Sequence, residues 1–185
     1  TLIVVFGLLF SSAPTAQAYS TAVWSEFIST GGGGGIARAD CAVGTSGEAI
    51  YAFETERSWA LTNFRAACTT LNSAGTGIGG WERTLGPYGQ DRNGNTYQVG
   101  RCDLEPNYNK VVVGATVYKD ASGYAIGLQV KCGTLPSGSY YSTQPVIGLT
   151  SGNSENINCP ANEVAVGLYV AYGGILDKFG LRCGP

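Results

Sequence analysis

Six cysteines lie along the chain as three successive pairs of similar spacing. The two members of each pair are 27, 30 and 24 residues apart. No C-x-x-C motif occurs, which excludes a zinc ribbon and a thioredoxin-type redox site. An even number of cysteines in a secreted chain indicates a disulfide framework, and this spacing favours one disulfide in each of three repeats. The predicted pairs are Cys41 with Cys68, Cys102 with Cys132, and Cys159 with Cys183.

The segments bounded by these cysteines are alike, which indicates an internal repeat. In each, an apolar run leads to a small residue, which is Ala52, Gly114 or Gly167. Alternating apolar and polar residues follow, then a polar or glycine turn, then a second alternating stretch that ends on a cysteine. Period-2 alternation is typical of half-buried strands, so each repeat is predicted to hold a β-hairpin. We expect the cysteines near its open end, where they can bridge the two strands.

The sequence therefore predicts an all-β protein with internal pseudo-threefold symmetry and three antiparallel sheets around one core. No segment after residue 18 combines sustained helical periodicity with helix caps. The predicted parts are a Gly-rich linker or first strand over 19–40 and a single β domain over 41–185, with repeats at about 41–80, 81–135 and 136–185. The predicted core residues are Ile50, Phe53, Leu61, Phe64, Val113, Val117, Ile126, Leu128, Val166, Leu168, Val170 and Leu181.

Residues 1–18 are predicted to be a secretory signal peptide. The apolar run Leu2–Phe10 is too short to span a membrane, and the small-residue sequence Ala16-Gln17-Ala18 is typical of a cleavage site. A basic region and an initiator Met are missing before it. The alternative is that the segment is retained, and that residues 1–12 form a strand donated to a neighbouring subunit of a filament. Both interpretations place the protein outside the cell.

The composition excludes several functional classes. The chain has no His, so it has neither a Ser-His-Asp triad nor a His-ligated zinc. Its 11 Lys and Arg residues are scattered and the net charge is −2, so no basic stripe for nucleic acid is expected. No metal or other cofactor is predicted. Low charge with 28 glycines and many aromatic residues favours an extracellular all-β protein with an uncharged ligand.

Two short motifs resemble β-prism proteins, whose fold consists of three Greek-key sheets. Trp59–Cys68 resembles the strand ending A-L-N-x-I-R-x-x-C of the vitelline membrane outer layer protein family. Gly173–Gly180 resembles jacalin-like lectins, in which G-x-x-x-D followed by a hydrophobic residue and Gly forms a sugar-binding loop. The other repeats have Thr55–Trp59 and Lys119–Gly123 instead, so at most one site of the lectin type carries over.

The resemblance implies a carbohydrate site in the loop of the third repeat. Asp177 would accept hydrogen bonds from sugar hydroxyls, and Tyr169 or Tyr172 would stack on the ring. Backbone N–H groups from Gly174 to Leu176 would donate, since glycine lets a ligand approach closely. The alternative is a hairpin turn whose Asp bonds its own backbone. The predicted site residues are Tyr172, Gly173, Gly174, Ile175, Leu176 and Asp177.

Four other sequence features are candidate sites. Gly31–Gly35 is a ligand-approaching loop or a flexible linker, and it lacks the remainder of a P-loop. Asp91–Asn95 lacks the Gly and Glu that a calcium loop needs at its sixth and twelfth positions, and is read as a turn. Ser137–Tyr141 is a Tyr/Ser/Gly surface loop suited to adaptable contacts. The acidic and aromatic residues Glu54, Glu56, Trp59 and Asp120 would suit a glycosidase if two carboxylates faced one cleft, but solvated strand faces are far commoner.

These observations predict a secreted, non-enzymatic protein that binds carbohydrate or forms an extracellular coat or matrix. Its expected partners are neutral glycans, with neither nucleic acid nor membrane binding in the mature form. The alternatives are a filament subunit that self-associates through residues 1–12 and, less favoured, an enzyme that acts on glycans.

Overall fold

The computed structural model describes residues 20–26, 35–41, 47–57, 59–71, 83–90, 96–102, 110–135 and 139–184. Thirteen strands and no helix occur in these ranges. The predictions made for residues 1–18, for 31–34 of the glycine run and for 91–95 lie outside them. Among the described residues, none forms a helix of the length and apolar character that a membrane span requires.

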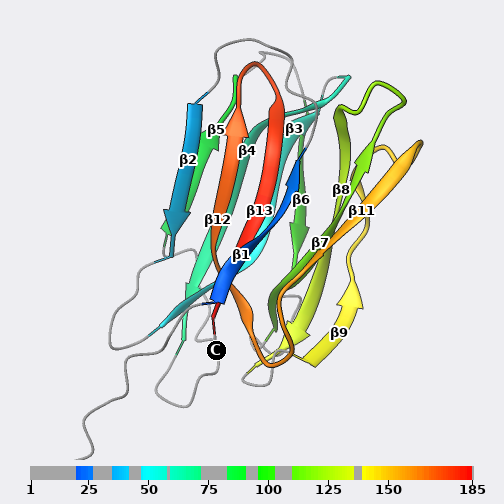
Figure 1. Cartoon of the computed structure of the whole chain (residues 1–185). Coiled ribbons are helices and arrows are strands. Elements are labelled where there is room, and N and C mark those ends of the chain that lie inside the picture. The colour runs from blue at the N-terminus through cyan, green and yellow to red at the C-terminus, as the bar shows by residue number, and fades with distance from the viewer. Residues whose placement is uncertain are drawn as a thin grey trace, which may run out of the picture.

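The strands form three sheets that enclose a common core (Figure 1). The first sheet has the order β5-β4-β3-β6 and contains β3 (Glu48–Arg57), β4 (Leu61–Thr70), β5 (Arg83–Tyr88) and β6 (Thr96–Arg101). The second has the order β10-β8-β7-β11 and contains β7 (Lys110–Lys119), β8 (Ala125–Thr134), β9 (Ser139–Thr143), β10 (Ile147–Gly148) and β11 (Asn153–Asn158); β9 also pairs with β8. The third has the order β1-β13-β12-β2 and contains β1 (Ser20–Glu26), β2 (Gly35–Asp40), β12 (Val164–Tyr172) and β13 (Leu176–Gly184).

Each sheet is a Greek key built on a central antiparallel hairpin, which confirms the predicted β-prism with pseudo-threefold symmetry. The hairpins are β3–β4, β7–β8 and β12–β13. In the first two sheets the flanking strands follow the hairpin in sequence. In the third sheet β1 and β2 flank the C-terminal hairpin, so the two ends of the chain complete one sheet. The strands of one sheet do not coincide with the residues of one cysteine-bounded repeat. For example, β5 and β6 follow Cys68 but pair with β4 and β3 of the first sheet.

The three predicted disulfide pairings are confirmed, but their position in the fold is not the predicted one. We expected each bridge to join the two strands of a hairpin. Instead, each joins two sheets: one cysteine follows an outer strand and its partner lies in a central strand of the next sheet. The pairs are Cys41 after β2 with Cys68 in β4, Cys102 after β6 with Cys132 in β8, and Cys159 after β11 with Cys183 in β13. Together they link the third sheet to the first, the first to the second, and the second to the third.

Each central hairpin has a β-bulge at the same place, and the bulged residue hydrogen-bonds to one cysteine of an inter-sheet disulfide. The register shifts at Tyr51, Val113 and Val166, and their carbonyls accept hydrogen bonds from the amides of Cys102, Cys159 and Cys41. The residue after each bulge is the small one noted in the repeat. A Cβ atom on Gly114 would lie 2.8 Å from the backbone oxygen of Ile157 in the outer strand. The repeated small residue is thus required by close strand approach.

All twelve predicted core residues are buried. Nine belong to the central cluster, which all three sheets line. Val113 and Val166 lie in a smaller cluster instead, and Ile126 is buried outside both. The bulge explains the first two, because an extra residue changes the face to which a side chain points. The rings of Phe53, Phe64 and Phe179 meet in the centre with centroids 5.2 to 5.5 Å apart.

Candidate functional site

The predicted carbohydrate loop is the turn of the β12–β13 hairpin. β12 ends at Tyr172 and β13 begins at Leu176, and the amide of Gly173 donates to the carbonyl of Ile175 at 3.1 Å. Figure 1 shows this turn at the top of the prism, at the opposite end from the C-terminus. The turn is accordingly held at one end of the third sheet.

The last residue of the glycine run lies beside this turn. Gly35 begins β2 and pairs with Tyr172 across the sheet. A Cβ atom on Gly35 would lie 2.9 Å from the Tyr172 hydroxyl, so glycine lets the phenol lie against the neighbouring strand. The structure thus brings together two features that the sequence analysis singled out separately. The remainder of the run, residues 31–34, is not described.

Burial divides the predicted site residues into two groups. Tyr172, Gly173 and Gly174 are partly exposed at the tip of the hairpin. Ile175 and Leu176 are buried, and Asp177 is only 4% exposed. The surface that the turn offers to a ligand therefore consists of backbone groups and the Tyr172 phenol, with the Asp177 carboxyl group behind it. The assignment of these six residues to a ligand stays a prediction.

A second tyrosine, which the sequence analysis did not single out, adjoins the turn. Tyr88 ends β5 in the first sheet, and its ring centroid lies 5.5 Å from that of Tyr172 with the planes inclined at 45°. The pair spans the junction between the first and third sheets. Nothing in the local sequence predicts this contact, because it depends on how two sheets pack.

The environment of this pair changes the acidity of one phenol. Burial raises the pKa of Tyr88 above its usual value of 10.0, and the neighbouring Tyr172 raises it further. A buried phenolate loses hydration, and two phenolates side by side would repel each other. Tyr88 is therefore a neutral hydroxyl at physiological pH, able to donate and to accept hydrogen bonds.

We expect this shift to appear as a high-pH loss of stability. The folded state binds the Tyr88 proton above the pH at which the unfolded chain releases it. The stabilisation is thus complete below about pH 10 and is lost as the pH rises through the folded pKa. In Tyr172→Phe, Tyr88 should titrate at a lower pH than in the parent, yet still above 10.0, because burial remains. NMR of 13Cζ-labelled tyrosine measures this, with Tyr88→Phe to assign the signal; an unchanged titration in Tyr172→Phe would contradict it.

Two of the three carboxylates considered for glycosidase chemistry have structural roles, and the third, Glu54, is half-buried in β3. Glu56 is 2% exposed, and its carboxylate accepts a hydrogen bond of 2.9 Å from Asn63 Nδ2. Asp120 Oδ1 accepts from the amides of Ser122 and Tyr124, both at 2.9 Å, and so holds the β7–β8 turn. Both side chains are thus engaged within the fold, and neither hydrogen-bonds to the other. The exposed Trp59 packs edge-to-face on Tyr124 at 5.1 Å.

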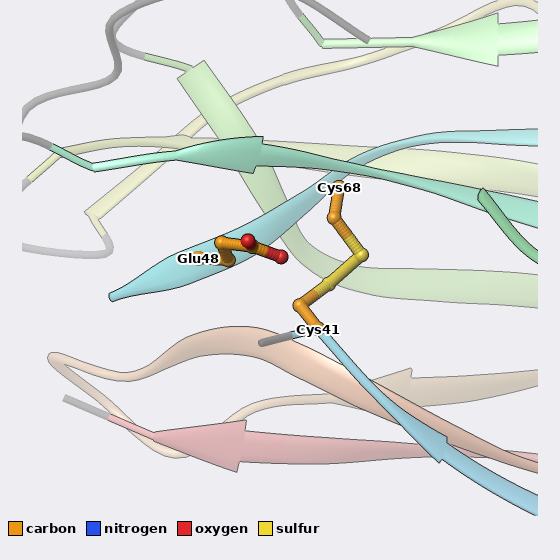
Figure 2. A group of neighbouring side chains, drawn as sticks. All are labelled: Cys41, Glu48 and Cys68. Carbon is orange, nitrogen blue, oxygen red and sulfur yellow. A yellow bond between two sulfur atoms is a disulfide. The ribbon is translucent and has the colours of Figure 1, made fainter. Parts of the chain in front are cut away.

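Among the described residues, one group has side chains close enough to resemble a metal site. Cys41, Glu48 and Cys68 have their sulfur and carboxylate oxygen atoms within 4.8 Å of one another. Figure 2 shows that the two sulfurs are joined in a disulfide, with the Glu48 carboxylate beside it. Disulfide sulfur is not a thiolate, which is the form that binds metal. The group offers one carboxylate, which does not make a metal site.

The fold of this chain is similar to that of several solved lectins. A mannose-binding lectin from Champedak has a TM-score of 0.57 at 17% identity, covering 91% of this chain and 99% of the lectin. Frutapin, a lectin from Artocarpus incisa, has a TM-score of 0.60 at 17% identity, covering 92% and 100%. A mannose-specific jacalin-related lectin from Morus nigra, in complex with mannose, has a TM-score of 0.57 at 17% identity, covering 94% and 99%.

At such low identity these similarities show the β-prism fold alone. Neither a protein-family model nor a curated protein matches this sequence.

Proposed function

We propose that this chain is an extracellular, non-enzymatic carbohydrate-binding protein whose sugar site is the β12–β13 turn. One observation carries the proposal: Gly35, Tyr172 and the partly exposed turn glycines converge at one end of the third sheet. The chain shares its fold with lectins that bind mannose. A neutral hexose is the ligand class that this chemistry favours, because the exposed groups are peptide units and phenols.

Each part of the turn has a role in the proposed site. Gly173 and Gly174 are partly exposed and would offer backbone amide and carbonyl groups to a sugar, although the Gly173 amide already donates to the carbonyl of Ile175. The Tyr172 ring offers an apolar face to the C–H groups of a pyranose, and its hydroxyl offers a polar end. Asp177 would supply acceptors, although its side chain is only 4% exposed.

We propose that the protein is secreted and acts in an extracellular coat or matrix. Three inter-sheet disulfides suit an oxidising environment, which supports secretion. A single shallow site gives weak binding to one sugar, so function in a coat or matrix would depend on several copies acting together. Membership of the vitelline membrane outer layer protein family remains part of the proposal.

Loss of the Tyr172 ring tests the site. We expect Tyr172→Ala to weaken binding to mannose-containing glycans on an array by about tenfold or more, because a stacked ring contributes on the order of 1 kcal/mol beyond area burial. Asp177→Asn, which keeps the side chain's shape, should also weaken binding. Isothermal titration with mannotriose measures both effects in solution.

Tyr118→Ala is the matched control. It removes a half-buried tyrosine from β7 in the second sheet, where the hydroxyl hydrogen-bonds to Gln129 at 3.2 Å. Binding should persist in this variant. Equal glycan binding by the parent, Tyr172→Ala and Asp177→Asn would refute the site, whereas no binding by the parent to any neutral glycan would refute the function.

A further inference from the structure

A pocket of about 370 Å³ lies on the second sheet. It is lined by residues of β7, β8, β9 and β11 and by the residues after β11, which include Val113, Lys131, Ser139, Tyr140, Asn158 and Asn162. This volume is in the range of small-molecule sites. Ser139 and Tyr140 belong to the Tyr/Ser/Gly stretch that was predicted to be a surface loop, but they form the start of β9, because the chain pairs with β8 there.

The strand register brings two of the residues that line the pocket, Lys131 and Asn158, close together. Gly114 of β7 pairs with Lys131 on one side and with Asn158 on the other. A Cβ atom on Gly114 would lie 2.7 Å from Asn158 Oδ1. Because Gly114 has no side chain, the lysine and the asparagine reach across it toward each other. The two side chains therefore meet over the glycine that follows the bulge.

The Lys131 ammonium donates hydrogen bonds to the amide oxygens of two asparagines. Its Nζ donates to Asn156 Oδ1 at 2.7 Å and to Asn158 Oδ1 at 2.9 Å. An ammonium has three protons, so one is left for a ligand. Thr116 also donates to Asn156 Oδ1, at 2.8 Å, which fixes that amide. With its oxygen on the ammonium, the Asn158 amide presents its NH₂ group as a further donor beside the lysine.

Among the residues that the structure describes, no acidic side chain pairs with this cation, in contrast to its counterpart in the third sheet. Gly167, the counterpart of Gly114, pairs with Asp40 and Arg182, and those two form a salt bridge. In the second sheet Asn158 replaces the aspartate. None of the residues that line the pocket is acidic. Burial lowers the pKa of Lys131, as expected for a cation that is partly desolvated and neutralised only by dipoles.

We propose that this pocket binds the carboxylate of an acidic pyranose, a uronic acid residue, through Lys131 and Asn158. A singly charged carboxylate fits one ammonium, whereas a phosphate dianion is better matched by Arg or several cations. Tyr140, which is 63% exposed at the rim, provides the ring face for the sugar. This site extends the proposed function to a second class of glycan, and its evidence is independent of the β12–β13 turn.

The test uses Asn158→Asp, which copies the arrangement of the third sheet. The new carboxylate would accept from Lys131 as the amide oxygen does, so the fold should be retained, but it would neutralise the ammonium and repel an anion. We expect D-glucuronate, followed by 1H–15N chemical-shift changes, to bind the parent with shifts at Lys131, Tyr140 and Asn158. Affinity should fall at least about tenfold in Asn158→Asp and in Lys131→Gln.

The remaining measurements distinguish the contribution of the carboxylate from that of the sugar ring. D-glucose should give no shifts at the pocket, and acetate should bind more weakly than glucuronate, with the difference lost in Tyr140→Ala. Tyr118→Ala is the control for general effects of substitution, and melting temperatures establish that each variant is folded. Glucuronate binding that is unchanged in a folded Asn158→Asp protein, or shifts with glucose equal to those with glucuronate, would overturn the proposal. Mannotriose binding and its loss in Tyr172→Ala report on the other site, so either proposal can fail alone.

Discussion

Replacing Phe179 by alanine is expected to lower the free energy of unfolding by about 3–5 kcal/mol. The ring is fully buried and lies edge-on to both Phe53 and Phe64, with centroids 5.5 and 5.4 Å away. Phe179 comes from the third sheet and the other two rings come from the first. Truncation would leave a cavity where these sheets meet, and rigid paired strands cannot collapse to fill it. Urea unfolding followed by near-ultraviolet circular dichroism measures the change.

Phe179→Leu is the matched comparison for this experiment. Leucine keeps most of the apolar volume, so the loss should be clearly smaller than for alanine. If alanine and leucine destabilised the protein equally, cavity formation would not be the cause. If Phe179→Ala were as stable as the parent, the three rings would not form the centre of the core.

Removing the disulfide between Cys159 and Cys183 is expected to cost about 3 kcal/mol of stability in the chain-entropy description. The bridge closes 24 residues and joins the end of β11 in the second sheet to β13 in the third. Alanine is used at both positions, because serine would place a hydroxyl group at position 183, where Cys183 is fully buried. Chemical unfolding under non-reducing conditions measures the effect, with both proteins retaining the other two disulfides.

The equivalent double substitution at Cys41 and Cys68 is the control for this interpretation. Its separation of 27 residues is nearly the same, so entropy alone predicts nearly the same loss. A much smaller loss at Cys159 and Cys183 than at Cys41 and Cys68 would mean that packing, rather than the covalent link, holds the second and third sheets together.

The candidate site was predicted in part because its signals are local. Gly173 and Gly174 mark a turn between two alternating stretches, and a turn is determined within a few residues of sequence. The burial of Asp177 and the contact with Tyr88 were not predictable, because they depend on a bulge at Asp177 within β13 and on the junction of two sheets. The lysine pocket was missed for the same reason: Lys131 and Asn158 are neighbours only because both pair with Gly114.

The sequence by itself determined the central hairpin of each repeat, a set of buried residues and the pairing of the cysteines, because alternation and regular spacing record short-range geometry. The small residue in each repeat is part of the same local pattern. Tertiary structure decided what those elements join. The disulfides cross between sheets, the first two strands complete the last sheet, and two equivalent positions differ in charge, because Asp40 neutralises Arg182 whereas Asn158 leaves Lys131 with its charge. These relations arise from packing three sheets around one core, where residues far apart in sequence meet and no local pattern records the encounter.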